Sequence, residues 1–247
     1  TMLQLPFRMK SNGMPIASGE ELDEYGEHLL ADFSPYLLTA PQEIDIDRFV
    51  TKYLHMQQDF QYLSHCGVYL GMTVFQTTNY IPVFCPETGL AEYASASAGT
   101  IIVDNSLMDE SQEHRYRFTV GHEGSHSILH PSYFLNSIGA ANEVSIPYMR
   151  CRADFALSAS DFANQSPILW TEERRAEQQA NRLASAILMP KCMVKILLAR
   201  MPYRCQFDWA QIAGEKISAT FNVSYEAAFY RLKELHYIER YEKLPQR

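Results

Sequence analysis

The sequence predicts an α+β fold in which helices come first, a small mixed sheet follows, and a largely buried helix comes after the sheet. Apolar residues recur at helical spacing near the amino terminus, and β-branched and aromatic residues then gather in short runs. The buried helix is predicted from His114 to His130, where apolar residues flank a pair of histidines. Hydrophobic residues form 47 % of the 247-residue chain, which is enough for a full core.

The elements before this helix are placed by spacing and by helix-breaking residues. Residues 1–18 show little periodicity and predict an arm. Residues 20–38 predict a helix that ends near Pro35, with its repeated acidic side chains on a solvated face. Residues 44–56 predict a second helix, because their apolar side chains recur at helical spacing. Strands, rich in Val, Ile, Tyr and Thr, are predicted at residues 66–75, 79–84 and 100–103.

Two histidines four residues apart are the most informative feature of the chain. Residues 122–126 read His-Glu-Gly-Ser-His, which is the HExxH pattern. Positions i and i+4 share one face of a helix, so the rings of His122 and His126 can reach one metal ion. Neutral imidazole suits zinc, whose open coordination position holds a water, and Glu123 can take a proton from that water.

The alternative to a metal site is a surface helix with two solvated histidines. Phe118, Thr119 and Val120 precede the motif, and Ile128 and Leu129 follow it. These flanks indicate a largely buried helix, in which unpaired polar side chains would be costly. The sequence therefore favours metal binding.

A third ligand is expected from a downstream helix at residues 170–189. Thr171 is suited to cap its start, and Pro190 marks its end. Glu177 shares a face with Ala180 and Ala184, and small residues on that face allow a neighbouring helix to approach closely. Glu173 lies on a similar face one turn earlier and is the rival ligand, while a solvated glutamate is the ordinary alternative for either position.

These two stretches resemble the ImmA/IrrE family of zinc metallopeptidases. Residues 115–130 are similar to its RxRFTxxHExxHxxLH stretch, and residues 177–190 to its ExxANxxAxxxLMP helix. The resemblance implies a zincin-like fold of the gluzincin type, with one Zn²⁺ per chain bound by His122, His126 and Glu177. It also implies that Glu123 is the general base. The resemblance extends over residues 45–238 and is strongest at the two motifs.

Two positions depart from the family pattern. Gly124 stands where the family often has a larger apolar residue, and glycine inside a helix costs about 1 kcal/mol relative to alanine. We expect either a close backbone contact or substrate access to explain it. Leu183 stands where Phe is usual, which predicts a change in packing only.

A long segment without clear periodicity, residues 131–169, separates the two motif helices. Loops of this length are usually functional or disordered, and this one must pass near the metal. We expect a lid or a substrate-selecting hairpin, and a passive surface excursion is the alternative. Cys151 in this segment is either a reactive thiol near the zinc or an inert buried cysteine.

His130 is a third histidine on the same stripe of the helix. It lies about 12 Å from His122 along the axis, at about 1.5 Å per residue, so all three histidines cannot bind one ion. We interpret His130 as a helix C-terminal residue favoured by the helix dipole, with an outer-shell role at the metal as the alternative.

The C-terminal part resembles a helix-turn-helix. Residues 208–241 predict two or three helices, with a turn at residues 221–224 and Ser224 as a cap. We therefore divide the chain into a zincin-like domain at residues 1–200 and a small helical segment at residues 201–247. Basic and acidic residues nearly balance in that segment, whereas direct DNA readout normally needs a basic face. A packing or partner-docking role is favoured over DNA binding.

Composition limits the compartment and the partners. The net charge of −8 argues against broad nucleic-acid binding and favours a neutral or basic protein partner. No signal peptide is visible, nor an apolar run near the roughly 20 residues that a membrane-spanning helix needs. The cysteines are odd in number and lack CxxC pairs, which predicts reduced thiols, a cytoplasmic protein and no cysteine zinc site; they are Cys66, Cys85, Cys151, Cys192 and Cys205.

Two functions follow as hypotheses. The first is a cytoplasmic zinc endopeptidase that cleaves a repressor or another regulatory protein, as the resemblance implies. The second is a regulator that binds protein and keeps the fold with weak peptidase activity or none. For the enzyme, we expect residues 100–104 to be the strand at the cleft that pairs with an extended substrate.

Overall fold

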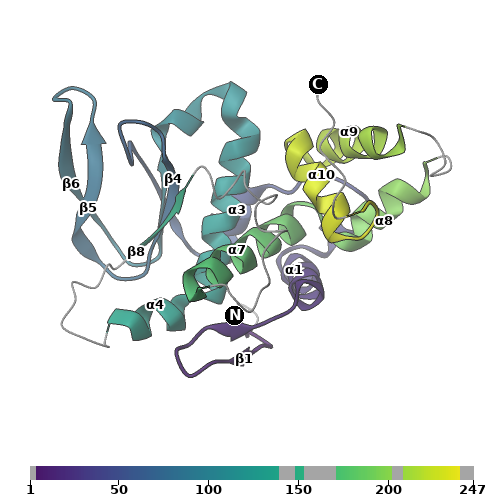
Figure 1. Cartoon of the computed structure of the whole chain (residues 1–247), viewed down its shortest axis with the longest axis horizontal. Coiled ribbons are helices and arrows are strands. Elements are labelled where there is room, and N and C mark those ends of the chain that lie inside the picture. Colours follow the sequence, from purple (N-terminus) through teal and green to yellow (C-terminus); the bar gives the residue numbers. More distant parts are fainter. Residues whose placement is uncertain (1–3, 139–147, 153–170, 202–207, 240–247) are drawn as a thin grey trace.

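The structure is a computed structural model, and it describes residues 4–138, 148–152, 171–201 and 208–239. Helix α3 (Glu113–Leu129) lies between a sheet on one side and helices on the other (Figure 1). It contacts the sheet through β4 (Tyr69–Val74) and the helical side through α7 (Glu172–Leu188). The expected mixture of helices and a small sheet is confirmed, and α3 coincides with the helix predicted around the paired histidines.

The sheet next to α3 is mixed, and its strand order is β3-β7-β4-β8. Strands β3 (Gln57–Gln61) and β7 (Thr100–Asp104) are parallel, whereas β4 is antiparallel to β7 and to β8 (Tyr148–Arg152). The expectation that residues 100–104 form the edge strand at the cleft is wrong. Every residue of β7 is buried, and both of its backbone edges are paired with neighbouring strands. Its short β-branched sequence is that of a central strand.

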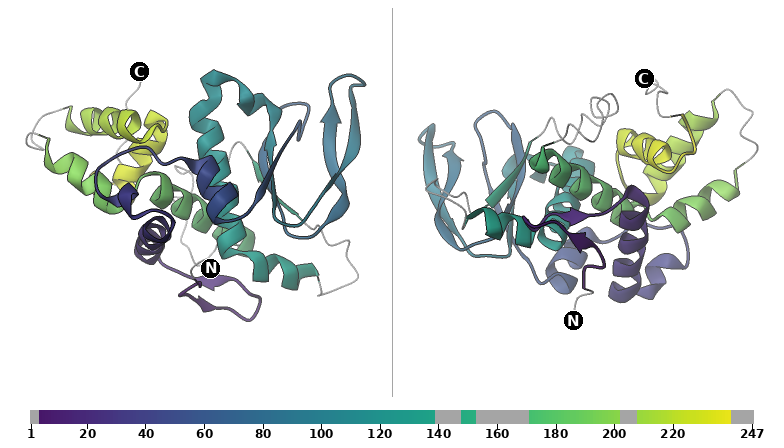
Figure 2. Two further views of the ribbon diagram at one scale, coloured as in Figure 1. Left: turned by 180° about the vertical axis from the view of Figure 1, so that it is seen from behind. Right: turned by 60° about the horizontal axis from the view of Figure 1, so that its bottom comes forward.

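Two hairpins accompany this sheet. Strands β5 (Thr78–Cys85) and β6 (Leu90–Ala96) form a hairpin on the far side of the sheet from α7 (Figures 1 and 2). Near the amino terminus, β1 (Arg8–Met9) pairs with β2 (Pro15–Ile16), so the predicted arm is in part a hairpin. Gly13, between β1 and β2, has a φ of +85°, which glycine adopts at little steric cost.

The N-terminal helices follow the predicted ranges closely. Helix α1 (Gly19–Phe33) begins at a capping box formed by Ser18 and Glu21. A 3₁₀ turn, η1 (Pro35–Leu38), follows it. The helix predicted at residues 44–56 is α2 (Ile46–Arg48), which continues as a π-helical turn, η2 (Phe49–Tyr53). Two further 3₁₀ turns, η3 (Asn105–Met108) and η4 (Glu110–Gln112), lead from β7 into α3.

Beyond α3, the predicted irregular segment begins with a helix. Pro131 starts α4 (Pro131–Ile138), because the first helical turn needs no backbone N–H from that residue. Strand β8 also comes from this segment, and its remaining residues, 139–147 and 153–169, lie outside the described part of the chain. The prediction of a segment without secondary structure is thus wrong for α4 and β8.

The helices of the C-terminal half begin at predicted caps. Thr171 accepts a hydrogen bond from the backbone N–H of Arg174 at the start of α7, and Ser224 accepts one from Ala227. Ser224 caps α10 (Tyr225–Glu234), which follows α9 (Trp209–Phe221) after a turn at Asn222. Helix α8 (Lys191–Ala199) lies between α7 and α9 in the sequence.

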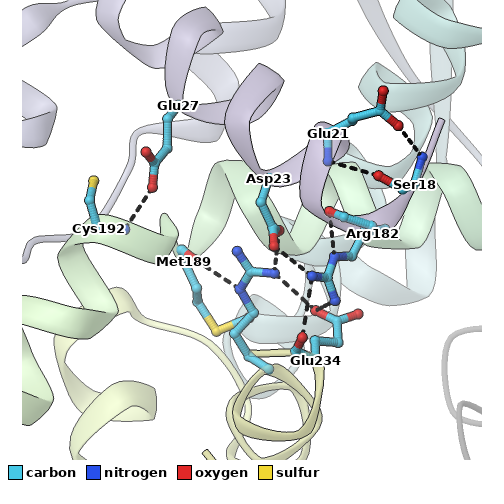
Figure 3. A network of polar contacts seen from close by, with 10 residues as sticks. Ser18, Glu21, Asp23, Glu27, Arg182, Met189, Cys192 and Glu234 are labelled. Carbon is cyan, nitrogen blue, oxygen red and sulfur yellow. Dashed lines mark hydrogen bonds and ion pairs between the residues drawn. The ribbon is translucent and has the colours of Figure 1, made fainter. Parts of the chain in front are cut away.

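A buried ion network joins α1, α7 and α10 (Figure 3). Asp23 is 1 % exposed and pairs with Arg182 at 2.5 Å and with Arg231 at 2.7 Å. Arg231 also donates to the backbone carbonyl of Met189, at the end of α7. The expectation that the acids of α1 lie on a solvated face is wrong for Asp23. Two guanidinium groups from distant helices compensate the burial of its charge.

The main apolar core is continuous across the boundary expected near residue 200. Leu22 of α1, Val120 of α3 and Leu183 of α7 belong to one buried cluster that also includes Trp209 and Leu232. Leu183 is fully buried there, in agreement with a packing role. Among the described helices, none combines the length and apolar character that crossing a membrane requires.

Candidate metal centre

Close packing of α3 against α7 brings the two sequence motifs together. Ala180 and Ala184 of α7 are fully buried, as expected for the face that Glu177 shares. A Cβ added at Gly121 of α3 would lie 3.7 Å from the Cβ of Ala184, an ordinary van der Waals distance. Small residues on both helices therefore allow the two backbones to approach, and longer side chains beside them can meet between the helices.

His122, His126 and Glu177 meet in this interface. Each offers one ligand atom, and these atoms lie within 4.8 Å of one another in a buried position. The Nε2 atoms of the two histidines are 2.9 Å apart. Oε2 of Glu177 lies 3.3 Å from Nε2 of His122, and its Oε1 lies 3.4 Å from Nε2 of His126. Glu173, the rival ligand, is exposed and does not belong to the cluster.

The outer nitrogen of each ring has its own partner. Nδ1 of His122 lies 2.8 Å from Oδ1 of Asn181, one turn beyond Glu177 on α7. Nδ1 of His126 lies 3.0 Å from Nδ1 of His130, and Nε2 of His130 lies 3.1 Å from Oε1 of Gln179. Asn181 belongs to the motif that resembles the family helix, but we assigned it no role from the sequence. No sequence pattern marked Gln179, because His130, the residue it contacts, is 49 positions away in the sequence.

These contacts allow a test of whether the residues suit a metal ion. An amide oxygen only accepts hydrogen bonds, so Nδ1 of His122 donates to Asn181 and its Nε2 carries the lone pair. Two nitrogen lone pairs and a carboxylate then converge on one buried point, where a cation satisfies all three. Two imidazoles and a carboxylate form the ligand set of catalytic zinc sites. The donor set therefore fits zinc.

The electrostatics of the cluster agree with this fit. Burial lowers the pKa of His126, although Glu177 acts in the opposite direction. Burial alone would raise the pKa of Glu177, but hydrogen bonding to the imidazoles outweighs it and holds the pKa of this carboxyl below its usual range. Such a bond needs a proton on Nε2, which a bound metal displaces. Neutral imidazoles and an ionised carboxylate are the protonation states in which these side chains bind a metal.

Glu123, the predicted base, lies against strand β4. Its Oε2 is 2.5 Å from the hydroxyl oxygen of Thr73, which is 1 % exposed. The same hydroxyl lies 3.0 Å from the backbone carbonyl of Glu123. Gly71, two residues earlier on β4, leaves room for the carboxylate, because an added Cβ would lie 2.7 Å from its Oε1. The sheet thus fixes the orientation of this side chain.

We expect the Gly71→Ala variant to be destabilised by about 1–3 kcal/mol, the usual cost of overpacking. The new methyl group would lie 2.6 Å from Cγ2 of Thr119 and 2.7 Å from Glu123, so one of these side chains must move. Chemical denaturation measures the effect. Gly121→Ala is the matched control, because its methyl group meets only ordinary contacts of 3.6 Å or more. Equal stability of Gly71→Ala and the unaltered protein would contradict this explanation.

A close contact explains the glycine at position 124. A Cβ there would lie 3.0 Å from Cγ1 of Val50 and 3.4 Å from Cδ1 of Leu54. Gly124 therefore lies on the side of α3 that packs against η2. Of the two explanations expected from the sequence, the close packing contact is the one that this geometry supports.

Helix α4 brings part of the segment 131–169 next to the histidines. The ring of Phe134 lies 6.4 Å from that of His126 and 6.5 Å from that of His130, measured between centroids. On its other side Phe134 stacks on Phe75, which follows β4, at 4.7 Å. The expectation that this segment passes near the candidate metal position is confirmed for α4.

The comparisons with known proteins agree with the resemblance of the motifs. Residues 155–233 match the family model of the IrrE N-terminal-like domain, a peptidase family designated M78. The matched residues include Glu177 and exclude the HExxH motif. None of the curated proteins compared with the chain gave a significant match. Over residues 155–233, the resemblance to the ImmA/IrrE metallopeptidase family is therefore confirmed.

Proposed function

We propose that the chain is a cytoplasmic zinc endopeptidase with a zincin-like fold of the gluzincin type. The observation that carries the proposal is the buried convergence of His122, His126 and Glu177 between two tightly packed helices. The match to a peptidase family supports a metallopeptidase in general. The finer assignment, of these three residues as ligands of one zinc ion, is our own.

The bound zinc would supply Lewis acidity towards a water and a scissile carbonyl group. Glu123 is the proposed general base and takes the proton of the attacking water on its carboxylate. The hydroxyl of Thr73, 2.5 Å from Oε2, holds that carboxylate in one orientation. Burial of the cluster excludes bulk water, which strengthens the interaction of the ligands with the cation.

The proposed substrate is a protein, and a repressor is the candidate that the family resemblance suggests. In the described part of the sheet, β8 has one unpaired edge and borders β4, the strand that contacts Glu123. An extended substrate segment can pair with such an edge through backbone hydrogen bonds, which supply affinity and little selectivity. We propose that selectivity comes from α4, whose Phe134 lies beside the metal-site histidines.

The C-terminal helices are proposed to support the catalytic helices. Arg117 of α3 donates to the backbone carbonyls of Asn222 and Ile44, so it ties the metal-binding helix to the turn before α10. Arg231 of α10 is fully buried and bonds the end of α7. Ala228, Phe229, Arg231 and Leu232 of α10 are buried and its other residues are only half-buried, whereas a recognition helix must present a well-exposed face to a DNA groove. We therefore favour a packing role over DNA binding for residues 201–247.

The alternative is a protein-binding regulator with weak peptidase activity or none. Such a regulator would keep the fold and the buried cluster. A metal ion bound by the same three residues would then stabilise the fold and would not take part in catalysis. Intact HExxH residues with Glu123 held by Thr73 favour the enzyme, because a structural metal site has no need for an oriented base.

The test is zinc-dependent cleavage of internal peptide bonds. The full chain is incubated with a library of proteome-derived peptides, and new termini are mapped by mass spectrometry. We expect cleavage that a chelator abolishes and that added zinc restores. Glu173→Gln is the control for loss of a nearby carboxylate outside the cluster. Zinc-loaded protein that cuts no internal bond would favour the regulator.

A further inference from the structure

A chain of hydrogen bonds runs from the N-terminal hairpin to the candidate metal centre. The side-chain amide of Gln179 donates from Nε2 to the backbone carbonyl of Pro15 at 2.9 Å. A carbonyl oxygen can only accept, so this contact fixes which end of the amide faces the hairpin. Oε1 of Gln179 must then face Nε2 of His130, 3.1 Å away. The orientation of Gln179 is therefore set by strand β2.

The orientation of Gln179 determines the tautomers of two histidines in turn. Because Oε1 accepts, Nε2 of His130 carries the proton, and Nδ1 of a neutral His130 is an acceptor. Nδ1 of His126 lies 3.0 Å from that acceptor and must donate to it. The lone pair of His126 is then on Nε2, the atom that faces His122 and Glu177. His130 is fully buried, and its two ring nitrogens face a neutral amide and another imidazole, so the neutral ring is favoured.

We propose that Pro15, Gln179 and His130 form a relay that holds His126 in the tautomer required for metal binding. This inference rests on the metal site proposed above, and it assigns His130 and Gln179 as positioning residues. His122 does not depend on the relay, since its Nδ1 contacts Asn181. The two histidines of one motif are thus oriented by separate partners, and one of those partners is controlled by the N-terminal hairpin.

The hairpin is docked closely enough to act in this way. A Cβ added at Gly13 would lie 2.6 Å from the backbone of Ser132 in α4, so the backbones of the hairpin and of α4 are in contact. Lys10 pairs with Glu172 at the start of α7 at 2.8 Å. Met14, which follows Gly13, is fully buried. Figures 1 and 2 show the hairpin beside α4 and α7 in each view.

The test reads the protonation of ring nitrogens by nitrogen NMR of isotopically labelled histidines in the metal-free full chain. In the unaltered protein we expect protons on Nδ1 of His126, Nδ1 of His122 and Nε2 of His130. Gln179→Met removes the acceptor for His130, so His130 should populate the other tautomer and Nδ1 of His126 should lose part of its proton. His122 should not change, because Asn181 is untouched.

Zinc affinity, measured by competition with a chromophoric chelator, gives the second readout. We expect Gln179→Met to weaken zinc binding about 10-fold to 100-fold, as loss of an outer-shell partner does. Gln178→Met is the matched control, since it makes the same change at the neighbouring position of α7.

The contribution of the hairpin is tested with glycine variants. Gly13→Ala should displace the hairpin from α4, free the amide of Gln179 to turn, and change His126 as Gln179→Met does. Gly89→Ala imposes similar backbone strain at a φ of +69° with no atom within 4 Å of the new methyl group, so it should have no effect on His126.

Three results would overturn the relay. They are an unchanged His126 in Gln179→Met, a joint change of His122 and His126, which would indicate general loosening, and an unchanged His126 in Gly13→Ala. Failure of the proposed function is separable from these outcomes, because the tautomers are read without metal. A protein that binds no zinc but shows the expected tautomers would keep the relay and lose the metal site.

Discussion

Replacing Glu123 by glutamine is expected to lower the rate of peptide-bond cleavage about a hundredfold to ten-thousandfold, the usual contribution of a positioned general base. The amide is nearly isosteric with the carboxylate, but it cannot take a proton from the attacking water. Thr73 can still donate to the amide oxygen, so the side chain keeps its place against β4. Zinc content and the free energy of unfolding should change little.

Initial rates on a single cleaved peptide, with zinc at saturation, measure this effect. Glu173→Gln makes the same chemical change at an exposed position of α7 outside the cluster, and we expect it to retain the full rate. If Glu123→Gln cleaves as fast as the unaltered protein, Glu123 is not the base.

Replacing Glu177 by glutamine is expected to weaken zinc binding by more than the roughly 10–100-fold that loss of an outer-shell partner costs. The variant loses the negative charge that faces both Nε2 atoms, at 3.3 and 3.4 Å. Its neutral amide can also donate from Nε2 to a histidine lone pair, and that hydrogen bond would compete with the metal for the same nitrogen. Cleavage should be lost together with zinc.

Chelator competition on the full chain measures this affinity, and Glu173→Gln is again the matched control. The two positions lie one turn apart on α7, but only Glu177 faces the histidines. Equal affinities of the two variants would show that Glu177 is not a ligand.

The sequence predicts the two helices that carry the site, because their signals are local. The spacing of His122 and His126, with apolar flanks, defines α3 to within a residue at each end. Thr171 and Pro190 bound α7, and the alanines on the face of Glu177 predict its contact with α3. Interactions within one or two helical turns determine these features.

Other features were not predictable, since they depend on contacts between distant residues. The sequence of β7 does not reveal whether a strand pairs on one edge or on two, and the pairing with β3 places it in the centre. Asp23 resembles any surface acid until Arg182 and Arg231 are brought to it. Gln179 gains its role from Pro15, 164 positions away.

The central claim, that His122, His126 and Glu177 bind one zinc ion, is tested most directly by X-ray absorption at the zinc edge of the zinc-loaded full chain. We predict nitrogen and oxygen ligands at about 2.0–2.2 Å, with the multiple scattering of two imidazoles and no sulfur. The His122→Ala variant should lose the zinc or show one imidazole fewer. Zinc with sulfur at about 2.3 Å, or a spectrum unchanged in His122→Ala, would contradict the account.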